Sequence, residues 1–125
     1  MRRDTDIVRY ILATVGDADG PVDMLGRLPE GVSEEAMAYH VRLLRAHGLV
    51  DAPEPARDLC GGYMGLTVDG LTWDGEDWLE ATEDGRVWRR TKEAVAKAAG
   101  STTLGVIKET AALVAMGLIR GELGL

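Results

Sequence analysis

Residues 33–50, SEEAMAYHVRLLRAHGLV, constrain the fold of this chain more than any other segment, because both ends of a helix are specified there. Ser33 is a preferred N-cap residue, and Glu34 and Glu35 place negative charge on the first turn, where the helix dipole favours it. Gly48 suits the left-handed backbone position that commonly follows a helix. The segment therefore predicts an amphipathic helix that stops at Gly48 and turns directly into a strand.

The two sides of this predicted helix differ in chemistry. Met37, Val41 and Leu44 recur at helical spacing and are expected to pack into a core. The opposite side is expected to face outward and carries Glu35, Ala38, Tyr39, Arg42 and Arg45. Arginine donates in a fork to guanine or to phosphate, and alanine lets a backbone approach closely, so this side suits a DNA groove. A solvated helix face that happens to hold two arginines is the alternative.

Two further helices are predicted before residue 33. Asp4 or Thr5 can cap a helix whose apolar face ends at Gly16. Pro21, which suits a first helical position, opens a short helix that runs through Leu28. These segments give three helices in the first part of the chain.

A hairpin is predicted after the helix that starts at Ser33. Residues 49–52 form its first strand, PEPARDLCGG its loop, and residues 63–73, with Tyr, Thr, Val and Trp, its second strand. Asp69-Gly70 is also a two-residue hairpin signal, but one long strand with at most a bulge at Gly70 is favoured. Three helices followed by a hairpin is the order of a winged helix-turn-helix. We therefore predict a mostly α fold with a small β-hairpin and additional C-terminal helices.

A further helix is predicted directly after this hairpin. Asp74 is expected to be its N-cap, and Trp73 before the cap is expected to pack against Trp78. We place the domain boundary just after this helix. The prediction is a winged helix-turn-helix domain over residues 1–82 and a C-terminal helical extension over residues 83–125.

The C-terminal third carries two more helical patterns, separated by Gly100 and Ser101. Residues 87–98 combine an apolar face with a basic one. The last helix is expected to present an apolar stripe made of Leu104, Ile107, Ala111, Val114 and Leu118. This stripe either covers the core of the same chain or forms the interface of a homodimer, which would set two recognition helices about one DNA turn apart.

Charge is distributed unevenly along the chain. The net charge of −7 arises mainly from residues 51–85, which hold ten acidic side chains and one basic side chain. An acidic loop in this region would oppose contact with phosphates. The overall acidity does not exclude DNA binding, because charges beyond about 10 Å are largely screened at cellular salt and the local surface decides. The candidates for contact with the DNA backbone are Arg2, Arg3, Arg86, Arg89 and Arg90.

Most other functional classes lack a signal in this sequence. The single cysteine, Cys60, excludes an internal disulfide, and His40 and His47 lie in no spacing that makes a metal site. The sequence has no glycine-rich phosphate loop and no recognisable pair of catalytic carboxylates, so we expect neither an enzyme nor a cofactor. The longest uncharged apolar stretch, residues 110–119, is about half of a membrane span, and residues 1–6 do not begin a signal peptide. We therefore expect a cytoplasmic protein with no membrane contact.

Five stretches of the sequence together resemble a known family. They are MRRDTDIVRYIL, SEEAMAYHVRLLRAHGLVDA, LTWDGEDWLEAT, DGRVWRRTKEAVAK and GSTTLGVIKE, and the most specific parts are AYHVRLL with GLV and LTWDG with DWL. Nearly from end to end, the chain is similar to the bacterial and phage family called domain of unknown function 2513. The resemblance implies a winged-helix-like fold and supplies no activity and no site residues. Asp69 and Gly70 stand where typical members have a basic or neutral residue before LTW, which weakens the expectation that the wing contacts DNA.

Two functions of different classes follow from these observations. The first is a small transcriptional regulator, dimeric, in which Tyr39, Arg42 and Arg45 contact the major groove of double-stranded DNA. The second is a winged-helix module for protein interaction, of phage origin, whose acidic segment at residues 51–84 docks on a basic partner or imitates the charge of DNA. Replacement of Arg42 and Arg45 separates the two hypotheses, because only the first needs these side chains.

Overall fold

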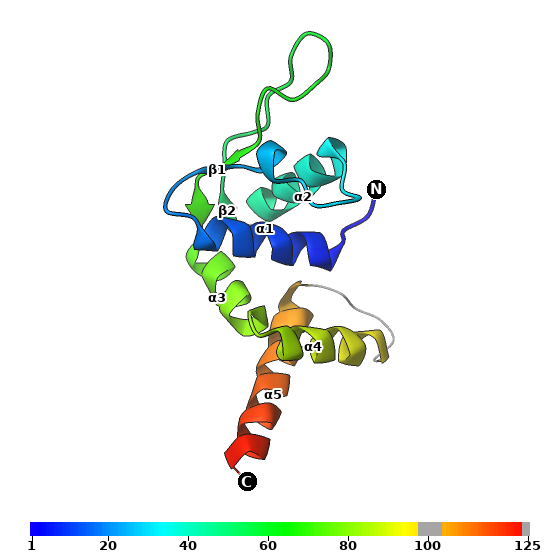
Figure 1. The fold of residues 1–125 in the computed structure, drawn as a ribbon, viewed down its shortest axis with the longest axis vertical. Helices are drawn as coiled ribbons and strands as arrows, with labels where there is room; N and C mark the ends of the chain where they lie inside the picture. Colours follow the sequence, from blue (N-terminus) through cyan, green and yellow to red (C-terminus); the bar gives the residue numbers. More distant parts are fainter. Residues whose placement is uncertain (98–103, 124–125) are drawn as a thin grey trace. The chain divides into compact units, whose positions relative to one another are not determined.

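The computed structural model describes residues 1–97 and 104–123 of the 125-residue chain (Figure 1). Over these residues the chain is mostly α-helical, with five α-helices, one 3₁₀ helix and two short antiparallel strand pairs, which confirms the predicted helical class. The chain divides into two compact units, Met1–Glu76 and Asp77–Leu125. The break predicted at Gly100 and Ser101 lies outside the described residues.

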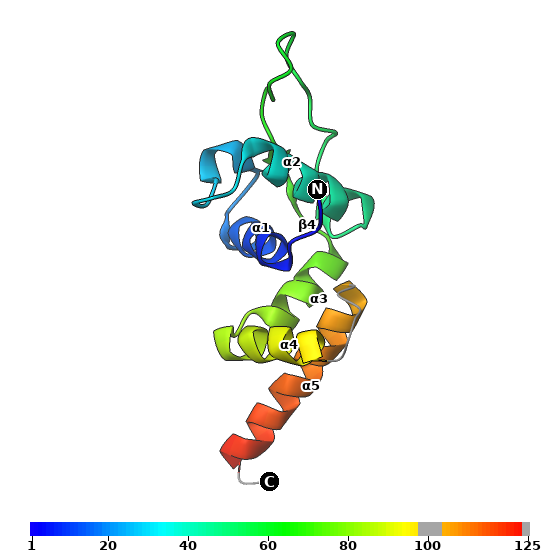
Figure 2. The same ribbon diagram turned by 90° about the vertical axis from the view of Figure 1, so that its right-hand side faces the viewer.

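The first unit contains the elements that build the candidate site. In chain order these are α1 (Thr5–Asp17), β1 (Val22–Asp23), the 3₁₀ helix η1 (Met24–Arg27), α2 (Glu34–Ala46), β2 (Val50–Asp51), β3 (Thr67–Val68), β4 (Gly70–Leu71) and the beginning of α3 (Trp73–Thr82). Figures 1 and 2 show a long loop that leaves β2, projects beyond α2 and returns to β3. Residues 52–66 are called the β2–β3 loop below.

The helices and strands of the first unit share one apolar core. The Asp4 carboxylate caps α1 by accepting a hydrogen bond from the Asp6 N–H at 2.9 Å. The fully buried side chains of the core include Ile11, Leu12, Met24, Met37, Val41, Leu44, Leu66 and Val68. Burial of a side chain of this size contributes about 1.5 to 3 kcal/mol. Because three of these residues come from α2, the core fixes which side of that helix remains outside.

Both ends of α2 follow the prediction. The Ser33 Oγ accepts a hydrogen bond from the Ala36 N–H at 3.1 Å, as an N-cap does. At the other end Gly48 has a φ of 79°, and the Leu49 N–H donates to the Leu44 carbonyl at 2.9 Å. This bond closes a Schellman stop, in which the left-handed residue is most often glycine. The chain therefore leaves α2 and enters β2 without an intervening loop.

The short helix predicted over residues 21–28 is wrong in its first part. Val22 and Asp23 form strand β1, and only a 3₁₀ turn follows as η1. The Asp23 Oδ1 accepts hydrogen bonds from the Leu25 N–H at 3.1 Å and from the Leu66 N–H at 3.0 Å. One carboxylate thus caps η1 and ties it to a distant segment, which holds the preceding residues in an extended backbone.

The second strand predicted at residues 63–73 is shorter and changes its partner along its length. β3 pairs antiparallel with β1, and β4 pairs antiparallel with β2. Between them the Asp69 N–H donates to the Asp51 carbonyl at 2.8 Å, so Asp69-Gly70 is not a hairpin turn. The opposed residues are Val22 with Val68, Asp23 with Thr67, Val50 with Leu71 and Asp51 with Gly70.

The cap of α3 is Thr72, where Asp74 was predicted. The Thr72 Oγ accepts a hydrogen bond from the Gly75 N–H at 3.1 Å, and its hydroxyl donates to the Gly48 carbonyl. A Cβ placed on Gly75 would lie 2.0 Å from the Leu49 carbonyl oxygen. The first turn of α3 can therefore approach the start of β2 only because residue 75 has no side chain.

The second unit contains the rest of α3, together with α4 (Gly85–Lys97) and α5 (Leu104–Leu123). The Trp78 ring packs edge-on against the Trp88 ring at 5.7 Å, and its indole N–H donates to the Leu104 carbonyl at 3.2 Å. The predicted packing of Trp73 on Trp78 is wrong, because Trp73 is 81% exposed whereas Trp78 is 2% exposed. Since α3 starts at Trp73, the two rings lie five residues apart on one helix and point to different sides.

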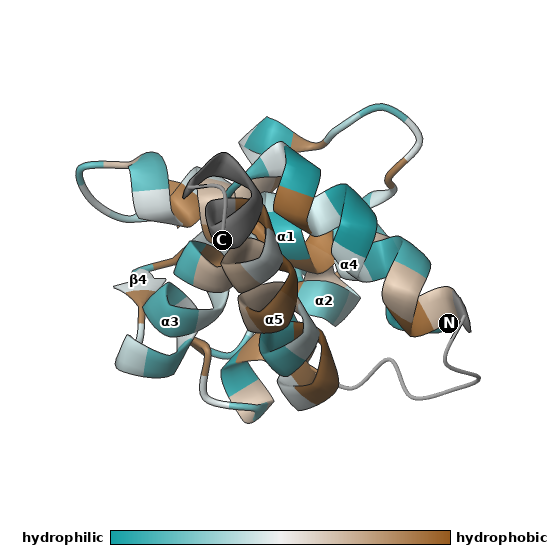
Figure 3. Cartoon of the chain, turned by 90° about the horizontal axis from the view of Figure 1, so that it is seen from below, coloured by the Kyte–Doolittle hydropathy of each residue, from teal (hydrophilic) through white to brown (hydrophobic). Residues whose placement is uncertain are grey.

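The stripe predicted on α5 changes from buried to partly buried along the helix. Its buried members are Leu104, Ile107 and Ala111, and its partly buried members are Val114 and Leu118. Figure 3 shows hydrophobic segments along α5 and hydrophilic segments on α4. On another side of α5, Leu113 and Met116 are exposed. The first half of the stripe thus belongs to the core of the second unit, and the homodimer stays a prediction.

Candidate nucleic-acid interface

The outward side of α2 carries four of the five residues that were predicted for it. The Arg42 and Arg45 side chains are 47% and 42% exposed, Glu35 is also exposed, and Tyr39 is partly buried. Ala38 is completely buried, so the prediction that it faces outward is wrong. It borders the packed face of the helix, where a single methyl group is small enough to be covered by the core.

Arg45 is tied to the beginning of the β2–β3 loop. Its Nη1 donates to the Glu54 Oε2 at 2.8 Å, and its Nε donates to the Ala52 carbonyl at 2.7 Å. Arg42 lies one turn earlier on α2, with its Nε 4.0 Å from the Glu54 Oε1. One carboxylate therefore lies between two guanidinium groups from consecutive turns of α2.

A second cluster, the loop anchor, joins the first turn of α2 to the β2–β3 loop and consists of Glu35, Arg57 and Tyr63. The Arg57 Nη1 and Nη2 lie 3.1 and 3.2 Å from the two Glu35 carboxylate oxygens. The Arg57 Nη2 also donates to the Tyr63 hydroxyl at 2.6 Å, and the Nη1 donates to the Gly61 carbonyl at 2.7 Å. The guanidinium lies 4.3 Å from the centre of the Tyr63 ring. Arg57 therefore positions the loop, and Glu35 is engaged by it.

Protonation of Glu35 is expected to release the loop anchor. Hydrogen bonds from Arg57 and Tyr63 lower the pKa of Glu35, and the hydrogen bond to Glu35 raises the pKa of Arg57. Because the folded pKa of Glu35 is depressed, its contribution is present above the ordinary carboxyl value of 4.5 and is lost as the pH falls through the lower folded value. Acid titration by NMR should move the Gly61 amide and Tyr63 ring signals together in that range.

The control for this titration is Glu35→Gln, which keeps the shape of the side chain and removes its carboxylate. The variant should show no shared transition at Gly61 and Tyr63 at acid pH. If the same transition persists in the variant, another group controls the loop and the assignment to Glu35 is wrong.

The tip of the β2–β3 loop is organised by a single carboxylate. The Asp58 Oδ1 accepts hydrogen bonds from the Cys60 N–H at 2.8 Å and from the Gly62 N–H at 2.9 Å. Gly61 between them has a φ of 84°, and the Leu59 side chain is exposed. Asp58 thus satisfies the backbone of its own turn, and the tip presents apolar and backbone groups.

His40 is buried on the inner side of α2 and connects it to the start of α1. Its Nε2 accepts a hydrogen bond from the Asp4 N–H at 2.8 Å, so its Nδ1 must carry the proton that it donates to the Ala36 carbonyl at 2.7 Å. Both ring nitrogens therefore have partners within the fold. The ring is almost completely buried and packs within the first unit.

The other predicted backbone contacts fall in two places. Arg2 and Arg3 are exposed directly before α1, in the first unit. Arg86, Arg89 and Arg90 are exposed on α4, in the second unit. The structure brings Arg42 and Arg45 together around one carboxylate.

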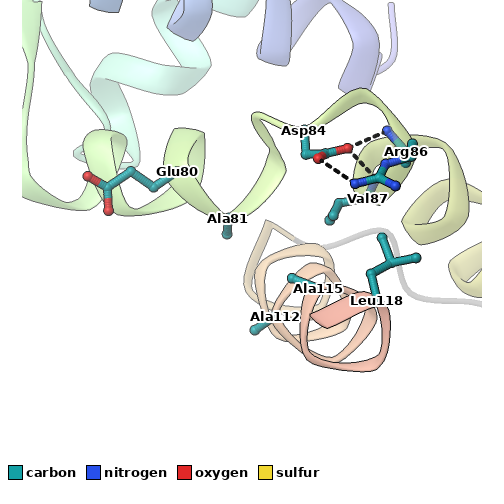
Figure 4. A pocket seen from close by; sticks show the side chains of 8 residues that line it. All are labelled: Glu80, Ala81, Asp84, Arg86, Val87, Ala112, Ala115 and Leu118. Atoms are coloured by element: carbon teal, nitrogen blue, oxygen red, sulfur yellow. Dashed lines mark hydrogen bonds and ion pairs between the residues drawn. The ribbon is translucent and has the colours of Figure 1, made fainter. Parts of the chain in front are cut away.

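A groove of about 320 Å³ lies within the second unit (Figure 4). At its rim the Asp84 Oδ1 accepts from the Arg86 N–H at 2.7 Å and from the Val87 N–H at 3.3 Å, and these bonds lower the pKa of Asp84. The Arg86 Nη2 lies 3.6 Å from the other Asp84 oxygen. The rest of the lining consists of Glu80 and of apolar side chains that include Leu118. Asp84 and Arg86 thus stabilise the start of α4.

Clustered metal ligands and membrane-spanning helices are both absent from residues 1–97 and 104–123. In those ranges no three His, Cys, Asp or Glu side chains lie close enough together to hold a metal ion. No helix within them is both long and apolar enough to cross a bilayer.

Sequence reasoning did not find the partners of the α2 side chains. Glu54 and Tyr63 were not singled out, although they lie against Arg45 and Arg57 in the fold. One signal was present in the sequence: Pro53-Glu54-Pro55 places a carboxylate between two prolines, which restricts its backbone to extended conformations. Tyr63 carried no comparable signal.

Comparison with known proteins gives one family and one relative. A family model described as "Hypothetical protein (DUF2513)" matches residues 2–102. A protein of Haemophilus influenzae described as "Uncharacterized protein" is 28% identical over 114 residues, which cover 89% of this chain and 92% of the relative. No solved structure matches the chain.

Proposed function

The chain belongs to the DUF2513 family, and we propose that it is a small winged-helix protein that binds double-stranded DNA through α2 and regulates transcription. The order of elements in the first unit supports this assignment: helix, strand, short helix, helix, strand, long loop and strand. The pairing of β1 with β3 and of β2 with β4 also fits a winged helix, in which the β2–β3 loop is the wing. In such folds the helix before the wing enters the major groove.

One observation carries the proposal, namely that Arg42 and Arg45 project from consecutive turns of α2 and converge on a single carboxylate. The Glu54 oxygens lie 2.8 Å from the Arg45 Nη1 and 4.0 Å from the Arg42 Nε. Two half-exposed guanidinium groups with this spacing can share a phosphate or address a phosphate and a guanine edge. The geometry is therefore suited to an anion with several acceptor oxygens, as the DNA surface offers.

The acidity of the chain is compatible with this role because the charges near α2 largely compensate one another. Glu35 is paired with Arg57 and Glu54 is paired with Arg45. Arg42 adds a positive charge on the same side of the helix. Acidic side chains farther away than about one Debye length are screened at cellular salt. Two of the acidic side chains at this side of α2 are thus neutralised by arginines, and Arg42 offers a further guanidinium group.

Replacement of Arg42 or Arg45 by alanine should weaken binding to duplex DNA by about tenfold or more. The plot of log affinity against log salt has a negative slope, and each variant that loses a phosphate contact should reduce the magnitude of that slope by about one. Lysine at the same positions keeps the positive charge but not the two-pronged geometry of the guanidinium group. The duplex affinity of these variants should lie between those of the wild type and the alanine variants. Fluorescence anisotropy with a labelled duplex of mixed sequence measures these effects across salt concentrations.

The control is Lys108→Ala, which removes a cation that pairs with Asp77 in the second unit. This variant should bind the duplex as the wild type does. Equal affinities for the wild type, Arg42→Ala and Arg45→Ala would contradict the proposal, and so would a wild-type protein with no duplex affinity at low salt.

A homodimer and a cytoplasmic location are part of this proposal. Leu113 and Met116 on α5 are exposed apolar side chains that a second copy would cover. A two-fold dimer would also present two α2 helices to the same duplex. Light scattering on the samples used for anisotropy gives the number of chains per duplex, and one chain per duplex would remove the dimer from the proposal.

A protein-interaction module is the second candidate, and Trp73 is the observation that favours it. This tryptophan is 81% exposed at the start of α3 and is followed by the exposed Asp74. Exposed aromatic side chains often anchor protein interfaces, and neighbouring carboxylates would select a basic partner. A lack of duplex binding would favour this second function, because it does not need Arg42 or Arg45.

A further inference from the structure

The segment Pro53-Glu54-Pro55 lies where the β2–β3 loop begins and carries the carboxylate that faces α2. Proline has a fixed φ, and a residue before proline is held in an extended backbone. The Ala52 carbonyl accepts a hydrogen bond from the Arg45 Nε at 2.7 Å, which fixes the chain directly before this segment. Glu54 is thus presented to α2 by a stiff stretch of backbone.

The Glu54 carboxylate lies where a phosphate group bound to Arg42 and Arg45 would lie. Its two oxygens approach the guanidinium groups of Arg45 and Arg42 at 2.8 and 4.0 Å. A carboxylate and a phosphodiester each offer one negative charge and two acceptor oxygens to such donors. The Glu54 side chain is 62% exposed, so water and an incoming anion have access to the same place.

We propose that Glu54 acts as an internal competitor for DNA, which occupies a phosphate position on Arg42 and Arg45 and must leave when a duplex binds. The inference rests on the proposed function and adds a residue that sets the affinity of the protein for duplex DNA. Exposed ion pairs of this kind are weak, so a polyanion can displace the carboxylate at small cost. At a given salt concentration the pair would therefore lower duplex affinity by a modest, constant factor without preventing binding.

The loop anchor does not share this role. Glu35 is held by Arg57 in a fork and also accepts from the Tyr63 hydroxyl at 3.1 Å. Its partners come from the loop, whereas the partners of Glu54 come from α2. Displacement of Glu54 would thus remove the carboxylate from Arg42 and Arg45. Arg42 would keep the hydrogen bond from its Nη2 to the Tyr63 hydroxyl at 3.4 Å, and the anchor would keep the loop in place.

The test is the variant Glu54→Gln, measured by anisotropy with the same labelled duplex of mixed sequence. Glutamine keeps the length of the side chain and removes its charge, so Arg42 and Arg45 lose their competitor. We expect duplex binding to become about fivefold tighter at low salt. The gain should shrink as salt is raised, because screening already weakens the internal pair in the wild type.

The matched control is Asp19→Asn, which changes the net charge by the same amount at an exposed residue in the loop between α1 and β1. If removal of any carboxylate tightens binding equally, Asp19→Asn will reproduce the gain, and the specific role of Glu54 is then overturned. Thermal unfolding of both variants should match the wild type, since neither side chain belongs to the core.

The possible results separate this inference from the proposed function. If the wild type binds and Arg45→Ala weakens binding, but Glu54→Gln equals Asp19→Asn, the proposed function stands and the competitor role fails. If neither the wild type nor Glu54→Gln binds any duplex, both fail. If the wild type binds, and Glu54→Gln binds more tightly than both the wild type and Asp19→Asn, both are supported, because the carboxylate then controls access to the arginines.

Discussion

Gly75→Ala is expected to destabilise the first unit by about 3 kcal/mol and to lower its thermal midpoint by about 10 °C or more. The new Cβ would lie 2.0 Å from the Leu49 carbonyl oxygen and 3.1 Å from its carbonyl carbon. Both are backbone atoms at the entry to β2, so no side chain can rotate to relieve the overlap. The start of α3 or the β2–β4 pair must shift instead. Thermal unfolding followed by circular dichroism measures the loss.

The control for this substitution is Gly26→Ala. Gly26 lies in η1, and a Cβ added there meets no atom within 4 Å. This variant should unfold close to the wild type, because alanine adds no overlap and reduces the freedom of the unfolded chain. Equal midpoints for Gly75→Ala and Gly26→Ala would mean that α3 does not approach β2 as closely as described.

Trp78→Ala should destabilise the second unit by about 3 to 5 kcal/mol. The substitution removes an almost completely buried tryptophan and its edge contact with Trp88. It also leaves the Leu104 carbonyl without the indole N–H that it accepts from at 3.2 Å. The near-ultraviolet circular dichroism of Trp88 should weaken as the packing around it is lost, and thermal unfolding should begin at a lower temperature.

Trp73→Ala is the matched control, because it deletes the same side chain five residues earlier in α3. Trp73 is exposed, so its removal opens no cavity and should change stability by about 0.5 kcal/mol or less. A loss of stability as large as that of Trp78→Ala would show that Trp73 is covered in solution. That result would also strengthen the interaction role considered for this residue.

The sequence predicted α2 well because its limits depend on nearby residues. Ser33 caps a backbone N–H three residues away, and Gly48 supplies a left-handed residue for a stop that closes within one turn. Both signals act through the local backbone and need no information about the rest of the fold. The spacing of the apolar residues then determined which side of the helix would be buried, with Ala38 as the exception at the edge.

The segment before α2 could not be predicted in the same way. Whether Val22 and Asp23 join a helix or a strand depends on Leu66, whose N–H reaches the Asp23 carboxylate from 43 residues away. Local preference favoured a helix after Pro21, and the tertiary contact overrode it. The cap of α3 was missed for a related reason, since Thr72 is fixed by a bond to the Gly48 carbonyl.

The candidate site shows the same division between local and distant information. The exposure of Arg42 and Arg45 follows from helical periodicity, and the structure agrees with it. Their partners do not follow, because Glu54 and the loop anchor reach α2 through a loop whose path no periodic pattern encodes. The side chains on the outer face of α2 could therefore be predicted, whereas the loop residues that pair with them could not.

The turn held by Asp58 has a practical consequence for studying this molecule in solution. It carries Cys60, which is exposed and is the one cysteine in the sequence. A maleimide dye would therefore attach at a defined point near the end of the β2–β3 loop in the unmodified chain. A change in the emission of the dye on adding DNA would show whether the tip of this loop contacts nucleic acid. The label needs no engineered cysteine.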